Sequence, residues 1–225
     1  MFFLCSLPTL VQVRLKPMPR RTIAIAAALS VLALGSPLIT GCTNPLATQY
    51  FNQGVEKYEA GNYQGAIDDW SKAIEINPQN AAAYYNRGDA KDNLGDDQGA
   101  IADYTKAIEI NPQNVIAYYN RGVSKGNLED YQGAISDYDK AIELDPQNAD
   151  AYNNRGVSKS YLEDYQGAIS DYTKVIEINP QYASAYYNRG IARELVNDLA
   201  GACSDWRKAA DFGLKEPAQW VKNQC

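Results

Sequence analysis

The sequence predicts an all-α protein, built as a right-handed superhelical solenoid of helix-turn-helix repeats. Two observations lead to this prediction. An Asn-Pro-Gln or Asp-Pro-Gln tripeptide recurs with a constant spacing of 34 residues, at Pro78, Pro112, Pro146 and Pro180. Between these prolines, apolar and small residues recur at intervals of three and four, which is the periodicity of a helix with one buried face. A fixed period of this length indicates stacked repeats, because one such unit is too small to bury its own apolar face.

The first 41 residues have the layout of an export signal. Arg20 and Arg21 precede an apolar run over residues 22–34, and the stretch ends in Ile39-Thr40-Gly41-Cys42. Ile-Thr-Gly-Cys resembles the lipobox of bacterial lipoproteins, in which the cysteine is lipidated and becomes the mature N-terminus. We therefore expect residues 1–41 to be a signal peptide. Lipidated Cys42 would then anchor the chain to a bacterial membrane, facing the periplasm or another extracytoplasmic space.

Two alternatives remain for this N-terminal stretch. A transmembrane helix over residues 22–41 is the first, although Gly35 and Pro37 interrupt the apolar run and leave it short for a span. Export by a twin-arginine route is the less favoured alternative, because Arg20-Arg21 lacks the rest of that motif. Met18 also offers a second start site.

A linker at residues 42–46 leads into the repeats. The five residue steps from Cys42 to Ala47 reach at most roughly 20 Å, at about 3.5 Å per step, so the first repeat should lie close to the membrane. Five repeat units follow at residues 47–80, 81–114, 115–148, 149–182 and 183–215. We expect residues 216–225 to form a capping helix, because a solenoid needs its last apolar face covered.

The second unit shows how each unit divides into two helices. Asn80 is a favourable N-cap for the first helix, and Gly95 can take the left-handed conformation that ends it. Asp96 then caps the second helix, which stops before Pro112 because a residue that precedes proline is pushed out of the helical region. Gly88 is one of the small residues expected where the two helices pass closely.

These residues resemble the tetratricopeptide repeat (TPR) family. The pattern is met by Tyr84, Gly88, Ala100, Tyr104, Ala107 and Pro112 and by their equivalents in the other units, from Ala47 to about Ala210. The chain departs from the family at one position, where an arginine replaces a common leucine. This arginine is Arg87, Arg121, Arg155 or Arg189, with Gln53 in the first unit.

The arginines point to an ion pair inside each unit. A second column places one aspartate on each second helix, namely Asp69, Asp103, Asp137, Asp171 and Asp205. We expect each arginine to bridge to the aspartate of its own unit, partly buried, and Gln53 to hydrogen-bond Asp69. The alternative is a set of solvated charges that contribute little.

The family resemblance implies a concave groove lined by the first helices. Carried onto this chain, the groove residues are Phe51, Asn52, Tyr85, Asn86, Asp89, Tyr119, Asn120, Asn154, Tyr187 and Asn188. Side-chain amides both donate and accept, so we expect a row of asparagines to pair with an extended peptide backbone. The tyrosines supply rigid contact area, while Asp89, Asp92 and Glu194 favour neutral or basic ligands. The alternative is that the asparagines are a relic of duplication.

Composition excludes several classes of function. The 21 basic and 27 acidic residues give a net charge of −6; four of the basic residues and no acid precede Cys42, so the remainder carries −10. Such an acidic body lacks the basic footprint that nucleic acid requires. The chain has no histidine, and its four cysteines lack metal-ligand spacing. We therefore expect no metal, no cofactor and no catalytic residues.

The cysteines fit an exported protein. With Cys5 removed and Cys42 acylated, Cys203 and Cys225 are left as a pair, and disulfides persist outside the cytoplasm. We expect this bridge to tie the last repeat to its cap. Two reduced thiols are the alternative.

The leading functional hypothesis is a membrane-tethered, non-catalytic scaffold that binds an extended polypeptide of another protein in the groove. The alternative is a self-associating structural or assembly-factor lipoprotein, which would use its convex face or its terminal repeats to form a homo-oligomer. This step rests in part on the family resemblance, because a fold alone does not specify a function.

Overall fold

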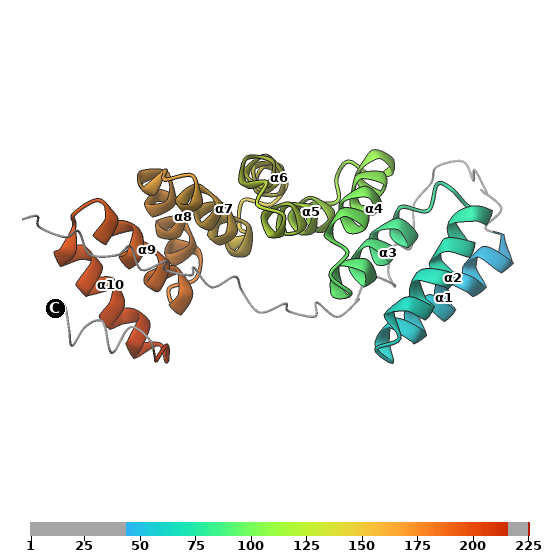
Figure 1. Ribbon diagram of the computed structural model, residues 1–225, viewed down its shortest axis with the longest axis horizontal. Helices are drawn as coiled ribbons and strands as arrows, with labels where there is room; N and C mark the ends of the chain where they lie inside the picture. Colours follow the sequence, from blue (N-terminus) through green and yellow to red (C-terminus); the bar gives the residue numbers. More distant parts are fainter. Residues whose placement is uncertain (1–43, 216–224) are drawn as a thin grey trace, which may run out of the picture. The chain divides into compact units, whose positions relative to one another are not determined.

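The computed structural model describes residues 44–215 and Cys225. The expected signal peptide, Cys42 and the capping helix up to residue 224 lie outside these residues. The described part is all helical and contains no strand (Figure 1). Its ten helices are α1 (Pro45–Glu59), α2 (Tyr63–Ile76), α3 (Ala81–Asn93), α4 (Asp97–Ile110), α5 (Val115–Asn127), α6 (Tyr131–Leu144), α7 (Ala149–Tyr161), α8 (Tyr165–Ile178), α9 (Ala183–Leu195) and α10 (Leu199–Asp211).

The helices form five antiparallel pairs that stack in chain order. The two helices of a unit pack on each other, from α1 on α2 to α9 on α10. The second helix of each unit then packs on the first helix of the next, as α2 does on α3 and α8 on α9. The predicted all-α solenoid of five helix-turn-helix units is therefore confirmed for the described residues.

Capping residues explain where the helices begin. Asn80, Asn114 and Asn148 each accept a hydrogen bond from a backbone N–H in the first turn of α3, α5 and α7, at 3.0–3.1 Å. The second helices have the same device, in which an Asn or Asp oxygen accepts from a glycine N–H; the capping residues are Asn62, Asp96, Asp130, Asp164 and Asp198. Each cap satisfies a helix donor that would otherwise lack a partner.

The first helix starts earlier than the sequence predicts. Asn44 caps α1 by accepting from the Leu46 N–H at 3.0 Å, and Pro45 occupies the first helical position. Proline is well suited there, since it has no N–H to lose and its φ is already helical. Two residues assigned to the linker, Pro45 and Leu46, are thus helical.

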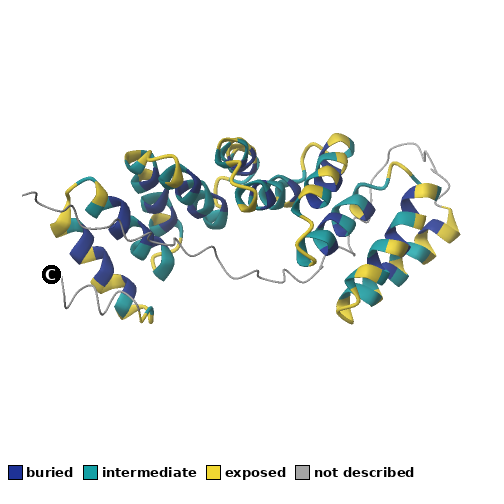
Figure 2. Cartoon of the chain, in the orientation of Figure 1, coloured by how far each residue is buried: buried dark blue, intermediate teal, exposed yellow. Residues whose placement is uncertain are grey.

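The core lies between the paired helices, as the dark-blue strips in Figure 2 show. A buried aromatic ring from each second helix faces a glycine of the first helix. A Cβ added at Gly122 would lie 2.7 Å from the ring of Tyr138, and one added at Gly156 would lie 2.8 Å from Tyr172. Glycine is therefore required for the close approach of the two helices, as expected from the sequence.

Candidate functional site

The first helices form a continuous row. In addition to its contacts within the stack, α3 contacts α5, α5 contacts α7 and α7 contacts α9. We call the surface formed by α1, α3, α5, α7 and α9 the first-helix row. All ten residues predicted to line a groove belong to these helices, as the resemblance implied.

Burial varies along the predicted asparagine column. Asn52 is exposed, Asn120 and Asn154 are half-buried, and Asn86 and Asn188 are buried. The tyrosines that precede them, Tyr85, Tyr119 and Tyr187, are half-buried, as are Phe51 and Asp89. The column is thus not an evenly exposed ladder.

The asparagines also bond between units. Asn120 donates its side-chain N–H to the hydroxyl of Tyr85 in the preceding unit, at 3.0 Å. Asn154 donates to Tyr119 in the same way, again at 3.0 Å. The tyrosine rings pack in turn on the buried tyrosines of their own units. These amide donors therefore link neighbouring units. This role was not predicted from the sequence, although the Tyr–Asn separation of 35 residues recurs there.

This pattern breaks between α7 and α9. Asn153 stands where the second and third units have tyrosine, so Asn188 has no phenol to bond. The side-chain oxygen of Asn153, which is 1% exposed, and the side-chain nitrogen of Asn188, which is 2% exposed, have no hydrogen-bond partner among residues 44–215 and Cys225. Unpaired buried polar atoms cost free energy, so this junction should be less stable than the two that have the Tyr–Asn bond.

The carboxylates of the row bond to hydroxyl groups. The hydroxyl of Tyr58 donates to Asp89 at 2.5 Å, that of Ser124 to Asp92 at 3.3 Å and that of Tyr182 to Asp150 at 2.8 Å. Because hydroxyls are neutral, these three bonds do not themselves neutralise the carboxylates. Burial raises the pKa of Tyr85, and the charges of Asp89 and Asp92 raise it further.

The predicted ion pair is present in each of the last four units. Nε and Nη2 of Arg87, Arg121, Arg155 and Arg189 donate to both oxygens of Asp103, Asp137, Asp171 and Asp205, at 2.5–3.0 Å. Each of these aspartates is 4% exposed at its side chain. Bidentate, charge-assisted bonds of this kind are the strong ones.

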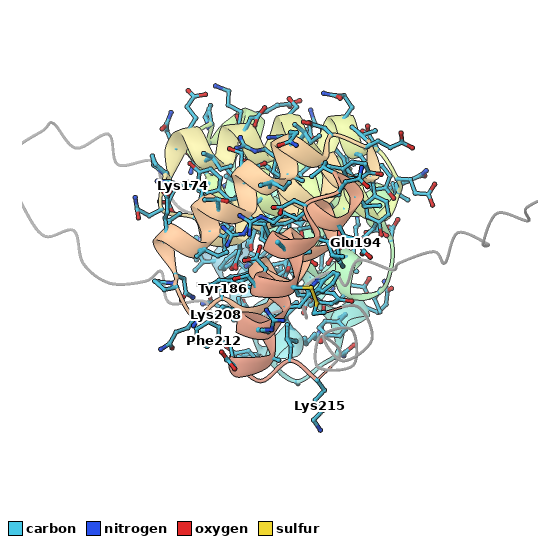
Figure 3. The ribbon with its side chains drawn as sticks, turned by 90° about the vertical axis from the view of Figure 1, so that its left-hand side faces the viewer. Lys174, Tyr186, Glu194, Lys208, Phe212 and Lys215 are labelled. Carbon is cyan, nitrogen blue, oxygen red and sulfur yellow. A yellow bond between two sulfur atoms is a disulfide. The ribbon has the colours of Figure 1, made fainter. Side chains whose placement is uncertain are left out.

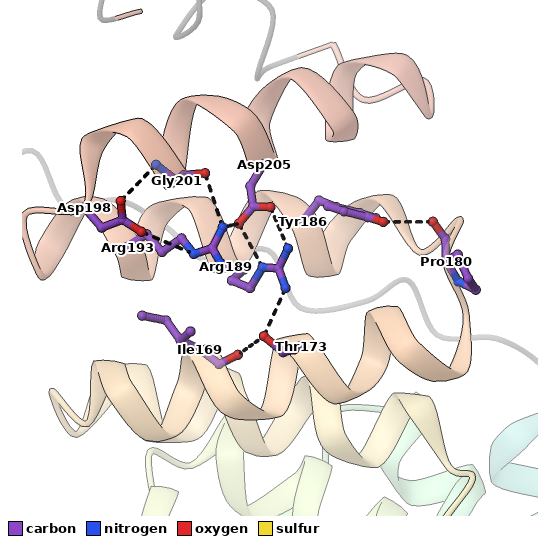
Figure 4. Close-up of polar contacts among 9 residues, drawn as sticks. All are labelled: Ile169, Thr173, Pro180, Tyr186, Arg189, Arg193, Asp198, Gly201 and Asp205. Atoms are coloured by element: carbon purple, nitrogen blue, oxygen red, sulfur yellow. Dashed lines mark hydrogen bonds and ion pairs between the residues drawn. The ribbon is translucent and has the colours of Figure 1, made fainter.

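Each bridge has two further members. A second cation of the first helix contacts the same carboxylate at 2.7–2.8 Å; these are Lys91, Lys125, Lys159 and Arg193. The remaining Nη1 of the arginine donates to the second helix of the preceding unit, at 2.6–3.0 Å, and its acceptors are Ser71, Thr105, Asp139 and Thr173. Figure 4 shows this arrangement around Arg189. The guanidinium therefore joins the two helices of its unit to the unit before it.

In the first unit, which has no arginine, the buried aspartate is paired with lysines instead. Asp69 was expected to bond Gln53, but the structure places Lys57 against it at 2.5 Å and Lys72 at 3.5 Å. An ammonium group neutralises a buried carboxylate better than an amide does, which explains the difference.

These bridges set the charge of the first-helix row. Every Lys and Arg on α1, α3, α5, α7 and α9 pairs with the aspartate of the second helix in its own unit. The cations are thus drawn toward the second helices, while acids remain on the row itself.

The last unit carries a disulfide. Cys203 in α10 is bonded to Cys225, with a Cα–Cα distance of 5.7 Å (Figure 3). Cys203 is buried and Cys225 is exposed. Two other properties concern only the described residues: no helix among them has the length and apolarity to cross a membrane, and no cluster of three acidic or cysteine side chains could hold a metal ion.

Comparison with known proteins agrees with this architecture. A family model described as tetratricopeptide repeat matches residues 81–114, 115–148 and 149–182, and a TPR repeat model matches residues 54–95. No curated protein is significantly similar to the chain.

Solved structures of other solenoids resemble the chain. The MamA protein is 28% identical with a TM-score of 0.72, and the match covers 74% of this chain and 91% of MamA. YrrB, a TPR protein with an unusual peptide-binding site, is 24% identical with a TM-score of 0.71, over 79% of this chain and 92% of YrrB. The type IV pilus biogenesis factor PilW is 20% identical with a TM-score of 0.64, over 75% of this chain and 78% of PilW. The last two likenesses concern the fold alone.

Proposed function

Because the chain belongs to the tetratricopeptide repeat family, we propose that it is a non-catalytic, membrane-tethered scaffold that binds an extended polypeptide segment of another protein along the first-helix row. The observation that carries this proposal is the charge arrangement of the row. Its cations are engaged by the second helices, and its partly exposed acids and half-buried tyrosines lie on the same first helices. YrrB, with its own peptide-binding site, provides a precedent in the same fold.

The bonds between units prepare the row for binding. Tyr85 and Tyr119 are held by Asn120 and Asn154, so a ligand meets rings whose positions are already fixed. Preorganised contacts lose less conformational entropy on binding than mobile ones. Asp89, Asp92 and Asp150 then favour neutral or basic segments and disfavour acidic ones.

Neutralising the acids of the row tests this proposal. The triple variant Asp89→Asn, Asp92→Asn and Asp150→Asn keeps an oxygen that can accept from each hydroxyl, so we expect the fold to survive. The control removes the same charge from the second helices, by Glu75→Gln, Glu109→Gln and Glu143→Gln. Fluorescence anisotropy would compare an extended lysine–serine peptide with its glutamate–serine counterpart.

We expect the purified protein to bind the lysine peptide in preference to the glutamate peptide, and the Asp→Asn variant to lose most of that preference. The control variant should keep it. Equal binding of both peptides, or an unchanged preference in the Asp→Asn variant with native circular dichroism, would show that the row is not the binding surface.

Membrane tethering through Cys42 is a separate part of the proposal. Its support is the order of basic residues, apolar run, small residues and cysteine in the sequence. Stable anchoring requires more than one acyl chain, as in the bacterial lipoproteins that this stretch resembles. Cys42→Ala should leave an uncleaved precursor or release the protein from membranes. The same apparent mass and the same membrane fraction as the wild type would refute lipidation.

A further inference from the structure

A second surface lies at the turns between the two helices of each unit. We call residues 93–97, 127–131, 161–165 and 195–199 the turn edge. Nine large apolar side chains are exposed among the described residues, and six of them lie on this edge. These six are Leu94, Leu128, Tyr161, Leu162, Leu195 and Leu199, exposed by 44–52%. Exposed apolar residues are normally scattered, so their concentration on one edge indicates an interaction surface.

The turns of neighbouring units lie side by side. Asn127 at the end of α5 donates to Asp97 at the start of α4, at 2.8 Å. Tyr161 at the end of α7 stacks on Tyr131 at the start of α6, with ring centroids 4.6 Å apart and an angle of 6° between the rings. Leu94, Leu128 and Leu162, which recur every 34 residues, therefore follow one another along a single edge.

Two glutamates on this edge occupy unfavourable backbone positions. Glu129 and Glu163 both have a φ of 63°, where the first and second units place Gly61 at 75° and Gly95 at 82°. Glycine suits the left-handed region and a residue with a Cβ does not, so each glutamate costs the fold stability that glycine would preserve. Strain of this kind is found where a side chain serves a function.

The negative charge of the turn edge indicates which kind of partner it would bind. The turn edge contains acids next to its apolar side chains and no lysine or arginine. A second copy of the chain would bring like charges together, and an anionic lipid surface would be repelled. A basic partner with apolar side chains would be attracted.

We propose that the turn edge of the third and fourth units docks an amphipathic protein segment whose apolar stripe is flanked by lysine or arginine. Its apolar side chains cover Leu128, Tyr161 and Leu162, and its cations pair with Glu129 and Glu163. This surface is distinct from the first-helix row and needs no ligand there.

The test uses the full protein and a labelled amphipathic helix made of leucine and lysine. Its counterpart has glutamate in place of lysine. The variant Glu129→Gly and Glu163→Gly removes both charges and restores the residue that the first two units use. The control, Glu143→Gln and Glu177→Gln, removes two charges from the second helices of the same units. The variant Leu128→Ser and Leu162→Ser removes the apolar contact.

We expect the leucine–lysine helix to bind and the leucine–glutamate helix not to bind. The Gly variant should weaken binding about fivefold, as the loss of two exposed ion pairs implies, while its urea midpoint stays or rises. The Ser variant should weaken binding at least about tenfold. Neutralising Asp89, Asp92 and Asp150 should leave this binding unchanged, which separates it from the first-helix row.

Three results would overturn the proposal. The first is an equal affinity of the wild-type, Gly and Ser proteins for the leucine–lysine helix. The second is self-association in light scattering that the Ser variant abolishes, which would assign the edge to a second copy. The third is binding of anionic vesicles by the edge, lost in the same variant, which would assign it to lipid.

Discussion

Replacing the arginine of the Arg121–Asp137 ion pair tests how much the ion pairs contribute to the free energy of unfolding of the repeat array. Arg121 donates to Asp137 at 2.9 and 2.6 Å and to Thr105 of the second unit at 3.0 Å. Replacing it by leucine, the residue common in the family, leaves the carboxylate with Lys125 at 2.8 Å. The loss of one partner of a buried charge costs roughly 3–5 kcal/mol. Because Lys125 remains, we expect Arg121→Leu to cost about 3 kcal/mol.

Urea unfolding followed by circular dichroism measures this cost. With a slope of about 2 kcal/mol per molar urea, the midpoint should fall by about 1.5 M. A double-mutant cycle with Asp137→Leu then isolates the pair, and the double variant should lose less than the sum of the single losses by at least about 1 kcal/mol. Glu143→Gln, at an exposed pair of the same unit, is the control and should leave the midpoint in place. An unchanged midpoint for Arg121→Leu, or strict additivity in the cycle, would refute the reasoning.

Three further outcomes are expected from the same assay. Asn153→Tyr should rebuild the phenol bond to Asn188 and raise the free energy of unfolding by about 1–2 kcal/mol; Asn153→Phe should gain less, and a Phe variant as stable as the Tyr variant would show that the hydroxyl is not used. Burial raises the pKa of Tyr119 above 10, so the folded state keeps its proton when the unfolded state loses it; the stability that Tyr119 contributes should be constant below about pH 10 and fall above it, and the 295 nm phenolate absorbance that is lost in Tyr119→Phe should appear only on unfolding, whereas its appearance in the folded protein would contradict this. Cys203→Ser opens a disulfide of sequence separation 22 and should cost about 3 kcal/mol, mostly in the last unit; an unchanged midpoint after reduction of the wild type would contradict it.

Most of the fold follows from the sequence, because its determinants are local. Asn80 and Asp96 cap helices at the predicted places, and Gly95 takes a φ of 82° where α3 ends. The Arg–Asp bridge could also be predicted, since a cation at an apolar position needs an opposite charge and the aspartate column supplies one per unit. These predictions depend on one unit alone.

The contacts between units could not be predicted in the same way. Whether Asn120 points to solvent or to Tyr85 depends on how far one unit rotates against the next, and no single unit encodes that angle. The burial of Asn86 and Asn188 follows from the same stacking. The helices that form the row can therefore be predicted from the sequence, whereas the burial of Asn86 and Asn188 on them cannot.

The contacts between units join residues at constant sequence separations, and this constrains how the number of repeats can change. Each arginine reaches back 16 residues to the preceding second helix, as Arg121 does to Thr105, and each asparagine of the intact pairs reaches back 35 residues, as Asn154 does to Tyr119. A copy of residues 115–148 inserted after itself would meet both partners at these offsets, so duplication of an internal unit creates no orphaned group. The end units lack this freedom, because the first has no arginine and the last is closed by a disulfide. Internal duplication or deletion, rather than growth at the ends, is therefore the route by which the array can be lengthened or shortened.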